Sequence, residues 1–112
     1  MGRDLPRGDV PALILAVLDE APAHGYAIAR AIERRSAGVL QLREGSLYPA
    51  LRALEQQGSV SSAWETTGVG PARKVYTLTD AGRAALVERA SDWGAYAAAV
   101  AAVLGKRRAS YG

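Results

Sequence analysis

The spacing of apolar residues changes at Gly58, and this change constrains the fold more than any other feature of the sequence. Before Gly58, apolar residues recur every three to four positions in three segments, which is the period of amphipathic helices. After it come two short β-compatible runs, "VSSAWET" and "ARKVYTL", separated by the turn-forming residues "TGVGP". Helical spacing then resumes after Thr79. We therefore predict three helices, one hairpin and a final long helix, in that order.

The first two helices have recognisable ends. One is predicted from about Val10 to Glu20, with Asp9 as its N-cap and a proline in its first turn, where a missing N–H is harmless. Its apolar face is wide, so this helix should be central. The next is predicted from about Gly25 to Arg35, and the single histidine, His24, suits a cap or turn before it. The side chains expected to face the core from this second helix are Tyr26, Ile28, Ala29 and Ile32.

The third helix is predicted from about Gly45 to Gln57. Pro49 should lie in its first turn, because proline deeper in a helix removes a hydrogen bond and clashes with the preceding turn. Gly58 is the expected C-terminal stop, since glycine adopts the left-handed conformation that ends many helices. The residues predicted to be buried follow the i, i+3, i+4, i+7 pattern and are Leu47, Ala50, Leu51 and Leu54.

The last helix is predicted to begin after Thr79, a suitable N-cap, with Asp80 near its positive end. It carries a heptad seam, which calls for a partner helix, most simply from a second copy of the chain. We therefore predict a winged helix-turn-helix domain over residues 1–78, with 1–8 as a flexible arm, a dimerisation helix over 79–104 and a basic tail over 105–112. The fold class is mainly α with a two-stranded wing. The seam consists of Leu86, Ala90, Trp93, Ala97, Val100 and Leu104.

Composition excludes several classes of function. The chain has no cysteine, so disulfides, thiolate zinc sites and thiol catalysis are excluded. One histidine with no evident acid partner makes no catalytic triad, and Ser46 lacks the G-x-S-x-G context. We expect no enzyme, metal or cofactor. No run approaches the roughly 20 apolar residues of a membrane-spanning helix, so cytoplasmic residence is the simplest expectation.

The outward face of the third helix is unusual for a solvated surface. It presents a serine, a tyrosine, a proline and an arginine in place of the Glu, Lys and Gln common on exposed helices. The first turns of a recognition helix reach DNA base edges, where arginine can bind guanine through two hydrogen bonds. Hydroxyls can bind phosphates. A solvated face with a capping serine is the alternative interpretation. The predicted DNA contacts on this helix are Ser46, Tyr48, Pro49 and Arg52.

Further candidate DNA contacts lie outside that face. The net charge of +3 is only a mild indication of a polyanionic partner, but several basic residues lie in the middle of the chain. Arg73 and Lys74 follow the turn of the hairpin and are predicted to contact the DNA backbone, although charges at a strand end also serve solubility. Arg43 just precedes the third helix and is a candidate phosphate contact. Tyr26 is a candidate as well, with core packing as its alternative role.

Trp93 is large for a seam built mainly of alanine, valine and leucine. Its simplest role is in the core of a dimer. Two symmetry-related indoles could also enclose a flat aromatic ligand, and Tyr96 lies close in sequence. Trp93 and Tyr96 are therefore candidate ligand-binding residues, with packing as the alternative.

Four stretches of the sequence resemble the PadR family of bacterial transcriptional regulators, specifically its small members. They are "HGYAIARAIE", "EGSLYPALRALEQQGSV", "GPARKVYTLTDAGRAAL" and the short helix that follows. The combination of "GSLYPALxxLExxG" with a downstream "RKxYxLTxxG" is specific to the family. One departure is "KVY", where the family often has "KYY", so Val75 removes an aromatic side chain at that position.

This resemblance implies a homodimeric repressor whose third helix enters the major groove of double-stranded DNA. It also implies a wing on the backbone or minor groove, a last helix that dimerises, and a small aromatic effector bound between the protomers. The rival interpretation is a winged helix that docks proteins without binding DNA. An outward face filled with acids would favour that role, and Tyr48, Arg52, Arg73 and Lys74 argue against it.

Overall fold

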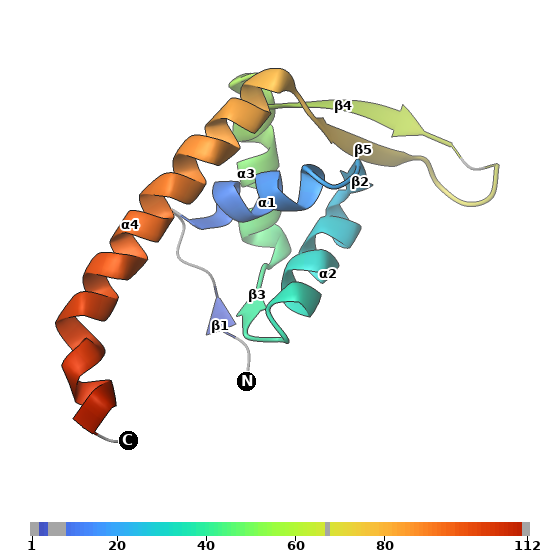
Figure 1. Cartoon of the computed structure of the whole chain (residues 1–112). Coiled ribbons are helices and arrows are strands. Elements are labelled where there is room, and N and C mark those ends of the chain that lie inside the picture. Colours follow the sequence, from blue (N-terminus) through green and yellow to red (C-terminus); the bar gives the residue numbers. More distant parts are fainter. Residues whose placement is uncertain (1–2, 5–8, 67, 111–112) are drawn as a thin grey trace.

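The computed structural model describes residues 3–4, 9–66 and 68–110, with side chains over 9–66 and 68–105. The main elements follow in the predicted order. The first three helices form a body, the hairpin projects from one side of it, and the last helix leaves on the other side (Figure 1). This is the predicted mainly α winged-helix architecture. The bounds are α1 Val10–Leu18, α2 Gly25–Arg35, α3 Glu44–Gln56, β4 Val60–Glu65, β5 Arg73–Leu78 and α4 Asp80–Ser110.

The α1 helix lies at the centre of the body, as its wide apolar face predicted. It packs against α2, α3 and α4, and Ile14 and Leu15 on it are fully buried. It ends at Leu18, short of the predicted Glu20. Asp9 occupies the N-cap position, but its side chain makes no capping hydrogen bond. Its backbone is already helical, whereas a capping side chain usually comes from an extended residue. The predicted N-cap position is therefore confirmed, but the side chain does not cap the helix.

The α2 helix has the predicted bounds, and His24 caps it. Nδ1 of the ring accepts a hydrogen bond from the backbone N–H of Ala27 at 3.4 Å. Ile28 and Ile32 are buried as predicted, but Tyr26 is 64% exposed, so its predicted inward position was wrong. Two residues along a helix correspond to a rotation of roughly 200°, so a side chain two positions before the buried Ile28 points the opposite way.

The α3 helix begins at Glu44 and buries Leu47, Leu51 and Leu54, as predicted. Gly58 ends it with φ of 79°. The N–H of Gly58 bonds to the carbonyl of Glu55 at 3.0 Å, and that of Ser59 to the carbonyl of Leu54 at 2.9 Å, which is the expected Schellman pattern. Pro49 lies within the helix and beyond its first turn, which corrects the prediction. Its missing N–H leaves the carbonyl of the exposed Gly45 without a helical partner.

Two short strand pairings were not predicted. β2 (Ala23–His24) pairs antiparallel with β5, so the hairpin belongs to a three-stranded sheet of order β2-β5-β4. β1 (Arg3–Asp4) pairs in parallel with β3 (Leu40–Gln41). β1 falls inside the predicted arm, and the other residues of 1–8 lie outside the described residues. Strands of two residues carry too little alternation to be recognised in a sequence.

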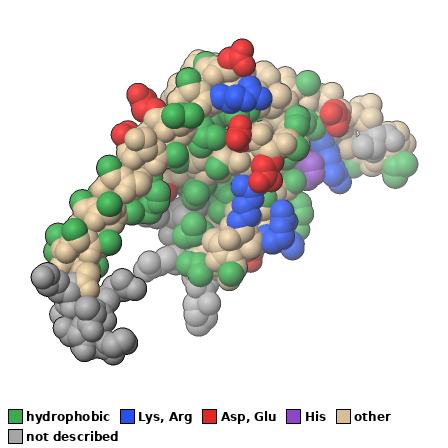
Figure 2. Space-filling view, viewed as in Figure 1, with side chains coloured by type: hydrophobic (Ala, Val, Ile, Leu, Met, Phe, Trp, Pro, Cys, Tyr) green, Lys and Arg blue, Asp and Glu red, His purple; other side chains and the backbone are tan. Residues whose placement is uncertain are grey.

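The start of α4 is joined closely to the body. Thr79 Oγ1 accepts a hydrogen bond from the N–H of Gly82 at 3.0 Å, which confirms the predicted cap, and donates to the carbonyl of Gly58 at 2.6 Å. The Arg83 guanidinium lies 3.8 Å from Asp19 of the α1 end. Beyond this junction α4 continues past Leu104 to Ser110, so residues 105–110, predicted as tail, are helical. Figure 2 shows hydrophobic side chains along the part of α4 whose side chains the structure describes.

Candidate nucleic-acid interface

The first turns of α3 present the side chains that the sequence predicted. Ser46, Tyr48, Pro49 and Arg52 are exposed, because the buried leucines on the same helix fix its orientation. The N-cap is Arg43, whose carbonyl accepts hydrogen bonds from Ser46 and Leu47 at 3.0 and 2.8 Å. Ser46 is therefore inside the helix, and capping does not explain its presence.

Tyr48 packs against the start of α2. A Cβ atom added to Gly25 would lie 2.7 Å from Tyr48 Oη and 2.9 Å from its Cε1, closer than real Cβ contacts. The absence of a side chain at Gly25 thus allows the ring to lie against the α2 backbone. Tyr48 is still 38% exposed. The ring position is held by tertiary packing while part of it remains available to a partner.

The strand register of the wing places its residues on two faces. Val60 pairs with Leu78, Ser62 with Tyr76 and Trp64 with Lys74. Because side chains alternate along a strand, these three pairs share one face, and the burial of Val60, Tyr76 and Leu78 shows that this face meets the body. Trp64 and Lys74 occupy the same face farther out along the hairpin.

A groove of about 520 Å³ lies between this face of the wing and the start of α2. Trp64 lines it and is 68% exposed, yet sequence reasoning had assigned it no site role. The signal that identifies it is the register, since Trp64 follows Val60 and Ser62 at two-residue spacing. The lining residues with rings or charges are His24, Tyr26, Tyr48, Trp64, Arg73, Lys74 and Tyr76.

Arg73 and Lys74, predicted as a pair, have different surroundings. Arg73 Nη1 lies 3.1 Å from Nε2 of His24, and both side chains are at the surface. Lys74 Nζ lies 3.7 Å from Oε1 of Glu55 on α3 and 5.8 Å from the centre of the Tyr76 ring. Burial, and next the Glu55 carboxylate, raise the pKa of Tyr76 above its ordinary value. Its hydroxyl therefore remains protonated at neutral pH.

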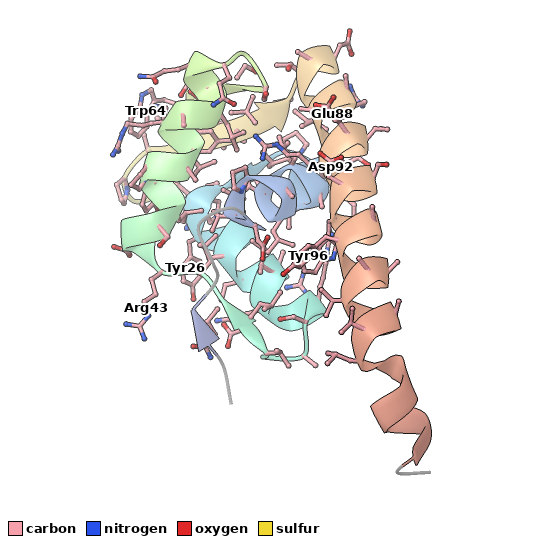
Figure 3. The ribbon with its side chains drawn as sticks, turned by 90° about the vertical axis from the view of Figure 1, so that its left-hand side faces the viewer. Tyr26, Arg43, Trp64, Glu88, Asp92 and Tyr96 are labelled. Carbon is pink, nitrogen blue, oxygen red and sulfur yellow. The ribbon has the colours of Figure 1, made fainter. Side chains whose placement is uncertain are left out.

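A second groove, of about 400 Å³, separates α2 from the start of α3. Tyr26 and Arg43, both predicted contacts, line it together with Arg30, which the sequence reasoning missed. Arg30 Nη1 donates to Tyr26 Oη at 3.2 Å, and its guanidinium lies 5.9 Å from the ring centre. Figure 3 shows Tyr26, Arg43 and Trp64 along the side of the body that lies away from α4. The predicted contacts Tyr26 and Arg43 thus lie on the same side of the body as Trp64.

The predicted seam on α4 is open to solvent along much of its length. Trp93 is 53% exposed, Val100 38% and Leu104 47%. Ala90 is exposed, whereas Leu86 and Ala97 are half-buried. The rings of Trp93 and Tyr96 lie 5.7 Å apart at 34°. An apolar row of this kind on a projecting helix is typical of a protein–protein interface.

Comparison with known sequences identifies the family. The family model for the Transcriptional regulator PadR-like family matches residues 14–88, which run from α1 into α4 and include α3 and the wing. The chain belongs to the PadR family. PadR-family proteins are transcriptional regulators, so this chain is a regulator and not an enzyme. None of the helices in the described parts of the chain combines the length and apolar character that crossing a membrane requires.

Several relatives and solved structures are similar over most of the chain. The transcriptional regulator Rv3488 of Mycobacterium tuberculosis is 35% identical over 86 residues, covering 77% of each chain. The structure of a PadR family transcriptional regulator from Eggerthella lenta is 34% identical with a TM-score of 0.75, over 88% of this chain and 83% of that one. The smu.1704 structure from Streptococcus mutans is 28% identical with a TM-score of 0.79, over 94% of each.

Proposed function

We propose that this PadR-family chain is a sequence-specific DNA-binding repressor that binds an inverted-repeat operator as a homodimer. The observation that carries the proposal is the exposed face of the first α3 turns, next to a wing with two cations. A helix presented in this way fits the major groove, and its positive end attracts phosphate. DNA of a bacterial cell lies in the cytoplasm, where we place the protein.

We assign separate roles to the helix and the wing. Arg52 would read a base edge, since guanidinium groups bind guanine O6 and N7 together. Tyr48 and Ser46 would bind phosphates through their hydroxyls, and Pro49 would pack against the groove edge. Arg73 and Lys74 of the wing would contact the backbone. Tyr26 and Arg43 line the 400 Å³ groove and would contact phosphates of the DNA backbone beside the major groove.

The dimer would form through the α4 seam. Its exposed residues, Trp93, Val100 and Leu104, would be removed from water by the same seam of a second copy. We further propose that a planar aromatic effector binds beside Trp93 and Tyr96, whose rings already lie in contact. Such a ligand between the two helices would change the angle of the protomers, and with it the spacing of the two α3 helices.

Selection of bound sequences from random duplex DNA tests the proposal directly. We expect an inverted repeat with half-sites centred roughly 10 bp apart, or a multiple of that, because a two-fold dimer presents two recognition helices about one DNA turn apart. Footprinting of the selected duplex, followed by a screen of planar aromatic compounds for its release, would complete the test. An asymmetric site occupied by one protomer would contradict the dimeric operator, and failure to enrich any sequence would favour a protein-docking module.

Arg52→Ala should weaken binding to the selected operator by about 1–3 kcal/mol while leaving binding to random duplex DNA nearly unchanged, because a lost base contact affects specificity. Arg73→Ala should weaken both and reduce the slope of log K against log salt by about one unit per wing. Arg34→Ala, which removes the same charge from an exposed position on α2, is the matched control. Fluorescence anisotropy across a salt series measures all three variants. If Arg52→Ala and Arg73→Ala show equal specificity and equal salt slopes, the separate roles that we assign to the helix and the wing are wrong.

A further inference from the structure

Glu55 connects the predicted recognition helix to both strands of the wing. Its Oε2 accepts a hydrogen bond from Ser62 Oγ of β4 at 2.6 Å. Its Oε1 lies 3.7 Å from Lys74 Nζ of β5. One carboxylate near the C-terminal end of α3 thus holds the inner face of the hairpin. Glu55 therefore pairs with a cation that we assign to DNA.

The ion pair with Glu55 restrains the Lys74 side chain, and this restraint is reversible. The side chains of Lys74 and Glu55 are 37% and 36% exposed, so water screens their attraction and a competing anion can replace the carboxylate. The Tyr76 ring, 5.8 Å from Nζ, lies on the same face and supports the amine in this position. Within the described part of the chain, Arg73 next to it forms no ion pair with an acidic side chain, and its guanidinium Nη1 lies 3.1 Å from Nε2 of His24.

We propose that Glu55 is a positioning residue for Lys74. While the protein is bound to DNA of arbitrary sequence, Glu55 keeps Lys74 in the ion pair. Lys74 leaves Glu55 and binds a phosphate only when α3 lies in the major groove of the operator. This inference rests on the proposed function. On non-specific DNA the wing is not held at a fixed distance from a phosphate. Breaking the Lys74–Glu55 ion pair then gives little gain in binding free energy. Base contacts from Arg52 fix the wing against the backbone, and exchange of carboxylate for phosphate then becomes favourable. Glu55 therefore increases the ratio of operator to non-specific affinity.

Glu55→Gln is the variant that tests this role. The amide keeps an oxygen that can accept the Ser62 hydrogen bond but no longer attracts Lys74. On random duplex DNA we expect tighter binding and a slope of log K against log salt that is steeper by about one unit per wing, since one more phosphate is neutralised. On the operator the slope should stay as in the wild type, because Lys74 already contacts phosphate there. The ratio of operator affinity to random-DNA affinity should therefore fall.

Three companion variants isolate the cause. Glu88→Gln removes the same charge from an exposed position on α4 and should leave the salt slope on random DNA unchanged. Ser62→Ala removes the other contact of the carboxylate and should also keep the wild-type slope. In a Lys74→Ala background, Glu55→Gln should no longer steepen the slope.

Two outcomes would contradict the role of Glu55 while leaving the proposed function intact. One is a Glu55→Gln slope on random DNA equal to that of Glu88→Gln. The other is a steeper slope that persists in the Lys74→Ala background. If the wild-type protein binds neither the selected nor the random duplex, the proposed function fails and this inference with it.

Discussion

Replacing Val100 and Leu104 together with aspartate is expected to separate the homodimer and abolish operator binding. The two side chains lie one turn apart on the α4 seam and are 38% and 47% exposed in the single chain. In a symmetric dimer the double variant would place four carboxylates in one apolar contact. Desolvation and repulsion of those charges should cost several kcal/mol, enough to dissociate the protomers.

Operator affinity should fall by roughly 10²–10⁴-fold, because a monomer loses the advantage of two linked half-site contacts. Sedimentation measures the oligomeric state, and anisotropy measures the binding. The control is Ala98→Asp with Ala102→Asp, which puts the same charges at the same spacing on exposed positions away from the seam. That control should remain a dimer. A Val100 and Leu104 variant that still sediments as a dimer would place the interface elsewhere.

Gly82→Ala should strongly destabilise the fold, although alanine is ordinarily the better residue in a helix by about 0.5–1 kcal/mol. Gly82 is buried in the first turn of α4. A Cβ atom there would overlap the backbone carbonyl oxygen of Ser59 and lie 2.7 Å from Leu78 Cδ1. Backbone cannot move aside as a flexible side chain does, so α4 would have to shift away from the turn after α3. We expect a loss of about 1–3 kcal/mol, the usual range for overpacking.

Gly45→Ala provides the matched comparison. Gly45 also lies near the start of a helix, is exposed, and an added Cβ would meet nothing within 4 Å. That variant should lose no stability and gain up to about 1 kcal/mol. Thermal or denaturant unfolding followed by circular dichroism, in the absence of DNA, measures both. Equal stabilities for the two variants would mean that the close approach of α4 to Ser59 is relieved without cost.

Much of the fold follows from local sequence because its causes are local. The buried row of Leu47, Leu51 and Leu54 determined which face of α3 is exposed, and therefore which residues are the candidates for DNA contact. Gly58 and Thr79 marked helix ends through conformational freedom and a side-chain hydroxyl. These signals act within a few residues, so the spacing of side chains alone predicts them.

Other features were decided only by tertiary structure. The packing of Tyr48 on Gly25 joins positions from two helices. The contacts of Glu55 with Ser62 and Lys74 depend on where the hairpin crosses α3. Sequence reasoning therefore identified the cations of the wing, whereas the acid that restrains one of them became visible only when strands and helix were packed together, since interactions between distant residues require their relative positions.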